Sequence, residues 1–281
     1  MTNFPWMRLP VIRVATHGCP HHLDELVAVS LLRSWAAEHS RSVEVTFLSR
    51  AEIAAASSSF DLLVDIGGEW SPEAGRFDHH QGGPAVAGRS AAGLVFDALF
   101  AADPRREFLT PVIQHVDELD SGMAQHHAPD ASNRAMRLIS LSAALKSLGG
   151  FRHDVGASHR CLSIIEPLVR SWLDQASGFA HAPTVIATSE RIGSTLLLDS
   201  DEPYGPGLLK YLATTNLTRV GFPAGPNRYQ VVALRDGQGN LMSPFRAADF
   251  PTAQFIHAQG FLAVFTDRAT AATAMMHMPS S

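Results

Sequence analysis

Four short stretches of the sequence concentrate acidic and imidazole side chains. Each stretch lies at the end of a predicted strand or helix, or in the loop beside it. Mixed sets of carboxylates and imidazoles suit Mn²⁺, Zn²⁺ or Fe²⁺ better than Mg²⁺ or Ca²⁺. The set is large enough for two ions. The candidate ligands are His17, His22 and Asp24, then Asp65, then Asp78, His79 and His80, and finally Asp117 and Asp120.

Two ions held about 3.5–4 Å apart can clamp both the attacking and the leaving oxygen of a phosphoryl transfer. A carboxylate at the end of a strand, such as Asp65, is well placed to be shared between them. His79 and His80 are consecutive, so their side chains diverge: one can bind a metal while the other faces a substrate phosphate. Asp78 can orient one of these imidazoles from behind.

Simpler interpretations compete at each position. A single histidine at a strand end is more often a hydrogen-bonded structural residue. Asp65 can cap a loop through the amides of Gly67 and Gly68, and those glycines can serve chain reversal alone. Asp24 can complement a helix dipole. The pair at 126–127 is predicted to lie in a loop. The coincidence of all four clusters at strand and helix ends nevertheless favours a metal site.

The N-terminal part shows the alternation of strand and helix that is typical of a parallel α/β sheet. In such sheets, ligands bind beyond the carboxyl ends of the strands. His17 and Asp65 both lie at such ends. Strands are predicted at 11–16, 43–48 and 62–66, with a helix whose apolar face runs from Leu23 to Leu31 and a short helix over 52–56 that Ser49 can cap.

Helical patterns continue through the middle of the chain, and strands dominate after residue 182. This shift in composition places a predicted boundary between Ala182 and Pro183, which separates an α/β metal-binding catalytic domain (1–182) from a smaller α+β substrate-binding domain (183–281). Helices are predicted at 90–100, 111–117, 133–148, 157–177 and 268–277, strands at 184–187, 195–198, 219–222 and 229–234, a hairpin turn at 236–240, and a last unit at 255–265.

Composition narrows the functional classes. The 281 residues carry a net charge of −5, which argues against a protein that coats long nucleic acid but permits a local site for short phosphate chains. Two cysteines, Cys19 and Cys161, provide no disulfide framework and favour a reducing compartment. The N-terminus lacks a signal-peptide pattern, and no apolar run reaches transmembrane length. These features predict a cytoplasmic protein without a membrane partner.

Five motifs, in order, resemble those of the melanocyte proliferating gene (MYG-type) exonuclease family, within the DHH phosphoesterases. The resemblance extends over about residues 11 to 277. One Asp-His-His motif would be a weak signal, whereas five in order are a specific one. The motifs are THGCPHHLDE (16–25), VDIGGE (64–69), RFDHHQ (76–81), VDELDSG (116–122) and FIHAQGF (255–261).

The resemblance implies a DHH-type α/β domain that holds two metals and a smaller C-terminal domain that closes over the substrate. Asp65 matches the bridging carboxylate, and His80 matches the phosphate-facing histidine. Asp120 matches the fourth motif better than Asp117. The remaining matches are His17, His22, Asp24 and His79 as metal ligands, and His257 and Gly260 as the C-terminal substrate motif.

The sequence departs from the family pattern at two places. Residues 18–21 read GCPH where the family usually has Asn-Gly-Thr-Phe, which makes His21 an additional candidate ligand. Residues 258–264 read AQGFLAV in place of Ala-Ser-Gly-Phe-Ile-Gly-Gly. The loss of the later glycines bears on how closely a phosphate can approach the backbone, and so on the identity of the substrate.

These observations predict a metal-dependent phosphodiesterase, a 3′–5′ exonuclease on short RNA or oligonucleotides with two divalent ions. Mn²⁺ is the favoured ion, with Mg²⁺ or Zn²⁺ as alternatives. Arg76 is expected either to touch the phosphate or to form a surface salt bridge, and His257 to contact substrate or pack between domains. The alternatives are a small-molecule phosphatase or pyrophosphatase with the same site, and a non-catalytic metal- or nucleotide-binding regulator. The sequence makes no prediction of oligomeric state.

Overall fold

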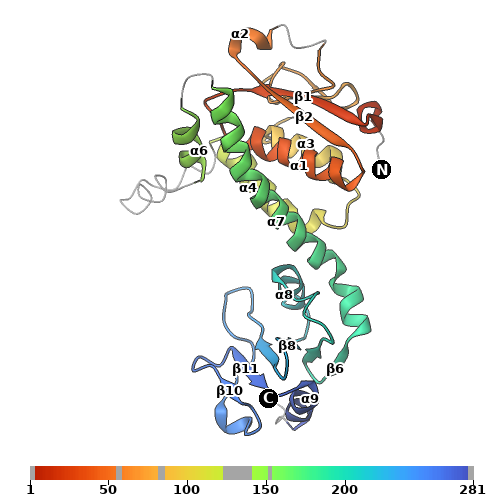
Figure 1. The fold of residues 1–281 in the computed structure, drawn as a ribbon, viewed down its shortest axis with the longest axis vertical. Helices are drawn as coiled ribbons and strands as arrows, with labels where there is room; N and C mark the ends of the chain where they lie inside the picture. Colours follow the sequence, from red (N-terminus) through yellow and green to blue (C-terminus); the bar gives the residue numbers. More distant parts are fainter. Residues whose placement is uncertain (1–3, 55–58, 82–85, 123–140, 151–153, 278–281) are drawn as a thin grey trace. The chain divides into compact units, whose positions relative to one another are not determined.

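The structure is a computed structural model that describes residues 4–54, 59–81, 86–122, 141–150 and 154–277 (Figure 1). The chain divides into two compact units, Met1–Leu173 and Asp174–Ser281. Part of the helix predicted at 133–148, and the histidine pair at 126–127, fall outside the described residues. No helix among the described residues combines the length and the apolar character needed to cross a membrane.

A five-stranded sheet forms the centre of the first unit, in the order β2-β1-β3-β5-β4. Neighbouring strands from β2 to β5 pair in parallel, and only β4 runs antiparallel to its neighbour β5. This pairing confirms the predicted α/β class with a parallel sheet. The strands are β1 (Val11–His17), β2 (Ser42–Leu48), β3 (Leu62–Val64), β4 (Trp70–Ser71) and β5 (Arg76–Phe77).

Helices cover both faces of this sheet, and in Figure 1 α2 and α1 lie on opposite sides of β1 and β2. Ile53 of α2 packs against a small cluster that includes Ala15 and Leu63. The helical segments are η1 (Pro5–Arg8), α1 (Asp24–Glu38), α2 (Arg50–Ile53), η3 (Pro72–Ala74), α3 (Ala91–Phe100), α4 (Arg106–Asp120) and α6 (Leu141–Gly149).

Helix α7 (Val155–Thr188) runs through the division between the two units. The predicted boundary between residues 182 and 183 therefore lies inside a helix, and the division falls earlier in the chain. The predicted strand at 184–187 is wrong, because these residues belong to the end of α7. Ala182 and Val185 lie three positions apart on one helical face and are both buried in an apolar cluster, so packing overrides the β-propensity of the Thr-Val-Ile run.

The second unit contains a six-stranded sheet in the order β10-β11-β9-β8-β7-β6. Only β7 and β8 pair in parallel. The predicted turn is confirmed, since the Asp236 amide donates to the Asn240 carbonyl (2.9 Å). The elements are β6 (Glu190–Ile192), β7 (Thr195–Leu197), α8 (Pro206–Leu212), β8 (Arg219–Pro223), β9 (Tyr229–Ala233), η5 (Ala247–Asp249), β10 (Phe255–Ile256), β11 (Leu262–Phe265) and α9 (Arg268–Met276).

Candidate metal centre

The carboxyl ends of three parallel strands bring the predicted ligands of the first unit together. His17 is the last residue of β1, Asp65 directly follows β3, and Asp78 directly follows β5. Asp24 is the first residue of α1, the helix that follows β1. Because parallel strands end at the same edge of a sheet, side chains distant in the sequence meet there.

Asp65 lies at the centre of this group. Its φ of +57° places it in the left-handed region, which is uncommon for residues other than glycine. Its Oδ2 lies 3.0 Å from His17 Nε2, and its Oδ1 lies 3.2 Å from His79 Nε2. Asp65 therefore bridges two imidazoles. The loop amide of Gly68 donates instead to Asp78 Oδ2 (2.6 Å), so capping this turn is the role of Asp78.

The other candidate ligands lie in groups that share Asp65 or His22. Asp120 Oδ2 lies 3.3 Å from His79 Nε2. Three sets have one potential ligand atom per residue within 4.8 Å of one another: His17, His22, Glu25 and Asp65; Asp65, His79 and His80; and His22, Asp24 and Asp120. The six residues predicted as metal ligands thus form one continuous cluster.

Asp117 has a different role from Asp120. Its Oδ1 accepts hydrogen bonds from the Ser90 amide (2.9 Å) and hydroxyl (2.7 Å), and its Oδ2 accepts one from Arg89 (2.5 Å). These contacts hold the start of α3 against α4. Asp120 is therefore the acid of the fourth motif that faces the cluster.

Neighbouring groups orient the imidazoles. His17 Nδ1 donates to the Gly18 carbonyl (2.7 Å), which leaves Nε2 as the nitrogen that faces Asp65 and that can bind a metal. Asp78 Oδ1 lies 2.8 Å from His80 Nδ1 and also accepts from the His80 amide (2.9 Å). The His80 side chain is 62% exposed, so its other nitrogen is accessible to a ligand.

The cluster perturbs the protonation of its members. Burial lowers the pKa of His17, but the hydrogen bond to Asp65 and the charge of Glu25 outweigh it and raise that pKa to about 10. The carboxylate of Asp65, against the opposing effect of burial, raises the pKa of His79 to about 9. Burial and the charges of Asp65 and Asp120 raise the pKa of Asp24 to about 8. Burial raises the pKa of Asp65 too, yet its histidine partners reduce it to about 2.

The donor set fits divalent cations. Two buried carboxylate oxygens of the cluster, Asp24 Oδ1 and Glu25 Oε2, have no hydrogen-bond partner among the described residues. Asp65 Oδ1 and His79 Nε2 contact each other as an ion pair. Leaving buried polar atoms unpaired costs about 1–3 kcal/mol each. A bound cation would pair with such oxygens and with an imidazole lone pair. Carboxylate and imidazole donors are the types that Mn²⁺ and Zn²⁺ accept.

Part of the chain that carries this cluster is similar to a known family. The model named MYG1_exonuc, described as "Uncharacterised protein family (UPF0160)", matches residues 13–102. The predicted resemblance to the MYG1 exonuclease family is confirmed over this segment. It contains His17, His22, Asp24, Asp65 and the motif at 78–80, whereas Asp120 lies beyond it.

Individual MYG1 relatives match a similar length. The chain is 34% identical over 96 residues to "MYG1 exonuclease" of Mus musculus and of Homo sapiens, which is 30% of this chain and 24% of each relative. It is 33% identical over 115 residues to "MYG1 protein" of Chlamydia trachomatis, which is 39% of this chain and 37% of the relative. The matched segments span only about a quarter to a third of these relatives.

Two solved RecJ structures cover most of the chain at low similarity. A complex of RecJ with Mn²⁺ from Thermus thermophilus is 16% identical, covers 95% of this chain and 51% of its own, and has a TM-score of 0.30. A structure of exonuclease RecJ bound to manganese is 15% identical, covers 94% and 88%, and has a TM-score of 0.28. A TM-score this low does not argue for a shared fold, so the α/β class rests on the strand pairing itself.

Glu25 belongs to the cluster but is absent from the set of ligands predicted from the MYG1-type motifs. The signal in the sequence is a second acid directly after Asp24, in the first turn of α1. His21, the additional candidate ligand, has both ring nitrogens engaged: Nδ1 lies 2.9 Å from Glu25 Oε1, and Nε2 lies 2.8 Å from Ser158 Oγ. His21 therefore supports the cluster from behind.

The predicted substrate residues belong to β5 and to the second unit. Arg76 is in β5, where its Nη1 donates to the Gly75 carbonyl (3.3 Å). His257 and Gly260 are in the second unit, and the ring of His257 lies 4.1 Å from that of Phe261 between centroids. Gly260 has a φ of +72°, and a Cβ there would meet the Phe245 carbonyl oxygen at 2.7 Å. This turn therefore requires glycine.

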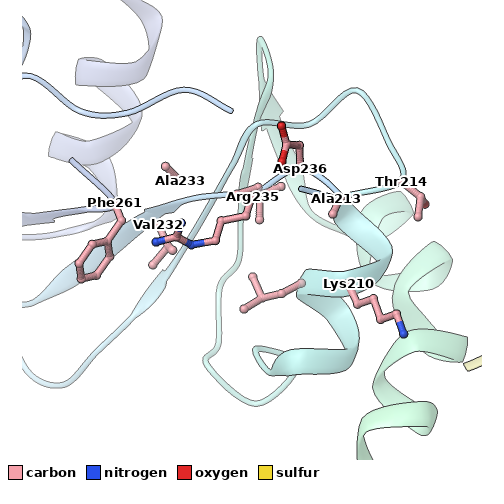
Figure 2. Close-up of a pocket in the computed structure, with 11 residues that line it drawn as sticks. Lys210, Ala213, Thr214, Val232, Ala233, Arg235, Asp236 and Phe261 are labelled. Carbon is pink, nitrogen blue, oxygen red and sulfur yellow. The ribbon is translucent and has the colours of Figure 1, made fainter. Parts of the chain in front are cut away.

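The second unit also contains a cavity of about 530 Å³ beside Phe261 (Figure 2). Leu209 of α8 and Ala213, which directly follows this helix, line it on one side, and Val232 near the end of β9 lines it on the other. Most of its surface is apolar. His257 and Gly260 are not among the residues that line it.

Proposed function

We propose that this chain is a metal-dependent phosphoesterase that cleaves phosphodiester bonds in nucleic acid, as a 3′–5′ exonuclease on short RNA or oligonucleotides. The observation that carries this proposal is the meeting of imidazoles and carboxylates around Asp65, with buried donor atoms that have no protein partner among the described residues. The names of the MYG1 relatives support the same class of activity.

Six residues would hold two divalent ions, with Mn²⁺ favoured: His17, His22, Asp24, Asp65, His79 and Asp120. When bound, such ions supply the Lewis acidity that activates water and offsets negative charge on a phosphate. Asp65, between His17 and His79, is the ligand that both ions would share. This sharing agrees with its central position in the cluster.

Two further residues would act on the substrate side. Asp78 fixes the ring of His80 through Nδ1, and the exposed ring, when it carries both protons, can donate from Nε2 to an anionic phosphate oxygen. Arg76, His257 and Gly260 remain proposed substrate contacts. A small-molecule phosphatase or pyrophosphatase is the second candidate, because the net charge of −5 opposes binding of long anionic polymers.

The test is turnover of labelled short RNA, dinucleotides and pyrophosphate with Mn²⁺ by the wild type and by Asp65→Asn. We expect kcat/KM of the variant to fall at least roughly 100-fold, since the substitution removes the buried negative charge that both ions would share. Asp61→Asn is the matched control, because Asp61 pairs with Arg13 outside the cluster. It should retain wild-type activity.

Full activity of Asp65→Asn would contradict the shared-ligand role. Cleavage of pyrophosphate without cleavage of RNA would select the small-molecule phosphatase. Tight Mn²⁺ binding without turnover of any phosphate ester would favour a metal-binding regulator instead.

A further inference from the structure

Glu25 is a fully buried acid at the edge of the metal centre. It occupies the first turn of α1, directly after Asp24. One of its carboxylate oxygens lies within 4.8 Å of a nitrogen of His17, a nitrogen of His22 and an oxygen of Asp65. Its Oε1 lies 3.9 Å from His17 Nε2, the nitrogen that faces the cluster. Glu25 is therefore close enough to take part in whatever the cluster binds.

The surroundings of Glu25 fix the orientation of its carboxylate. Oε1 accepts a hydrogen bond from the His22 amide (3.0 Å) and lies 2.9 Å from His21 Nδ1. His21 in turn contacts Ser158 of α7 through Nε2 (2.8 Å). All three side chains, Glu25, His21 and Ser158, are buried. Both contacts thus hold the same oxygen, Oε1, and fix which carboxylate oxygen faces His21 and the His22 amide.

A purely structural role leaves one feature of Glu25 without a cause. Its Oε2 is buried and has no hydrogen-bond partner among the described residues. The neighbouring acids Asp24 and Asp65 make a further negative charge at this place unfavourable. Packing and hydrogen bonding to the His22 amide need only a neutral acceptor, which a glutamine would provide. A cation in the cluster would satisfy both the unpaired oxygen and the excess of negative charge.

We propose that Glu25 is a further ligand of the metal centre, and that His21 and Ser158 hold its carboxylate in place. This inference rests on the proposed function, since it assumes that the cluster binds divalent ions. It adds an acid to the six residues given above and assigns His21 to support. The ligand class is a divalent transition-metal ion, with Mn²⁺ as the probe.

The experiment compares Mn²⁺ binding by the full chain with that of Glu25→Gln, by calorimetry and by the electron paramagnetic resonance of free Mn²⁺. We expect the dissociation constant to rise at least about tenfold. Urea unfolding in EDTA should show that the metal-free variant is as stable as the wild type or more stable, because one of several crowded acids has lost its charge. Glu44→Gln, an exposed position on β2, is the matched charge control and should bind as the wild type does.

The same measurements separate the alternatives. Wild-type affinity in Glu25→Gln overturns the inference and leaves the proposed function intact. A metal-free variant that is destabilised but binds Mn²⁺ normally shows a structural role, which also overturns it. If Glu25→Gln does not fold, Ser158→Ala decides: weaker binding supports the inference and unchanged binding overturns it. Absence of Mn²⁺ binding in the wild type would instead refute the proposed function.

Discussion

The stability of the metal-free first unit should fall as pH rises from 6.5 to 9. In this state Asp65 is the counter-charge of two imidazoles, and the pKa of His17 is raised to about 10 and that of His79 to about 9. A histidine whose folded pKa lies above its unfolded value stabilises the fold below the unfolded pKa, and this stability is lost as pH rises through the folded pKa. The window therefore opens near pH 6.5 and closes near pH 9 to 10.

The size of this loss in the free energy of unfolding follows from the two histidine pKa values and from how deeply the rings are buried. For His79, a shift of this size corresponds to roughly 3 kcal/mol in a fully buried group. The His79 side chain is 17% exposed, so partial solvent screening reduces the contribution to about 1–2 kcal/mol. The His17 side chain is buried to a similar degree, at 19% exposed, but it shares Asp65 with His79, and contributions that share a partner do not add. We expect a total loss of roughly 2–4 kcal/mol in the free energy of unfolding.

Asp24 changes the stability in the same direction. Its pKa is raised to about 8 in the folded state, so the folded state binds more protons than the unfolded state between the ordinary aspartate pKa and pH 8. Its contribution therefore also falls as pH rises. Asp65 behaves in the opposite way, because its folded-state pKa is lowered to about 2. Its contribution to stability rises with pH, but only in the acid range below pH 4.

Tryptophan fluorescence during urea unfolding measures this effect selectively. All four tryptophans of the chain, Trp6, Trp35, Trp70 and Trp172, lie in the first unit. The measurement is made in EDTA at pH 6.5 and 9 on the wild type and on Asp65→Asn. The variant should show a much smaller difference, because its histidines lack the counter-charge. Equal stability of the wild type at both pH values, or an unchanged difference in the variant, would refute the reasoning.

Substitution of two glycines by alanine tests how closely neighbouring segments pack in each unit. A Cβ at Gly207 would lie 1.8 Å from the backbone oxygen of Gln175 in α7, so Gly207→Ala should destabilise the second unit by roughly 3 kcal/mol or more. Hydrogen exchange of the β8 amides checks this, with Gly237→Ala as the control because a Cβ there meets nothing within 4 Å. A Cβ at Gly93 would lie 2.4 Å from Asp117 Oδ1. Although alanine favours a helix, Gly93→Ala should therefore lower the free energy of unfolding by about 1–3 kcal/mol, as measured by tryptophan fluorescence. Unchanged protection or stability would contradict either expectation.

The α/β class of the first unit could be predicted because its long elements carry strong periodicity. The run Val11–Thr16 and the apolar face from Leu23 to Leu31 each appear in the structure as a single strand or helix. The strands β4 and β5 at one end of the sheet have two residues each, which is too short for any pattern to show. The wrong prediction of a strand at 184–187 has another cause. The β-branched residues there favour a strand by local propensity, but the burial of Val185 on one face of α7 favours the helix.

The members of the candidate site that lie at the ends of parallel strands could be predicted from the sequence. His17 and Asp65 follow from the rule that ligands collect beyond the carboxyl ends of parallel strands. The choice between Asp117 and Asp120 does not follow from periodicity, since residues three apart share one helical face. Tertiary contacts decide it, because Asp117 is occupied by Ser90 and Arg89, far away in the sequence.

The start of α3 links these acids physically. The Ala91 amide donates to Asp24 Oδ2 (3.3 Å), and the Ser90 amide donates to Asp117 Oδ1 (2.9 Å). Because α4 carries both Asp117 and Asp120, fixing Asp117 against α3 also sets where Asp120 meets the cluster. Gly93 permits this close approach, since any larger residue would displace the Asp117 carboxylate. The position of Asp120 in the cluster thus depends on Gly93, which leaves room for the Asp117 carboxylate.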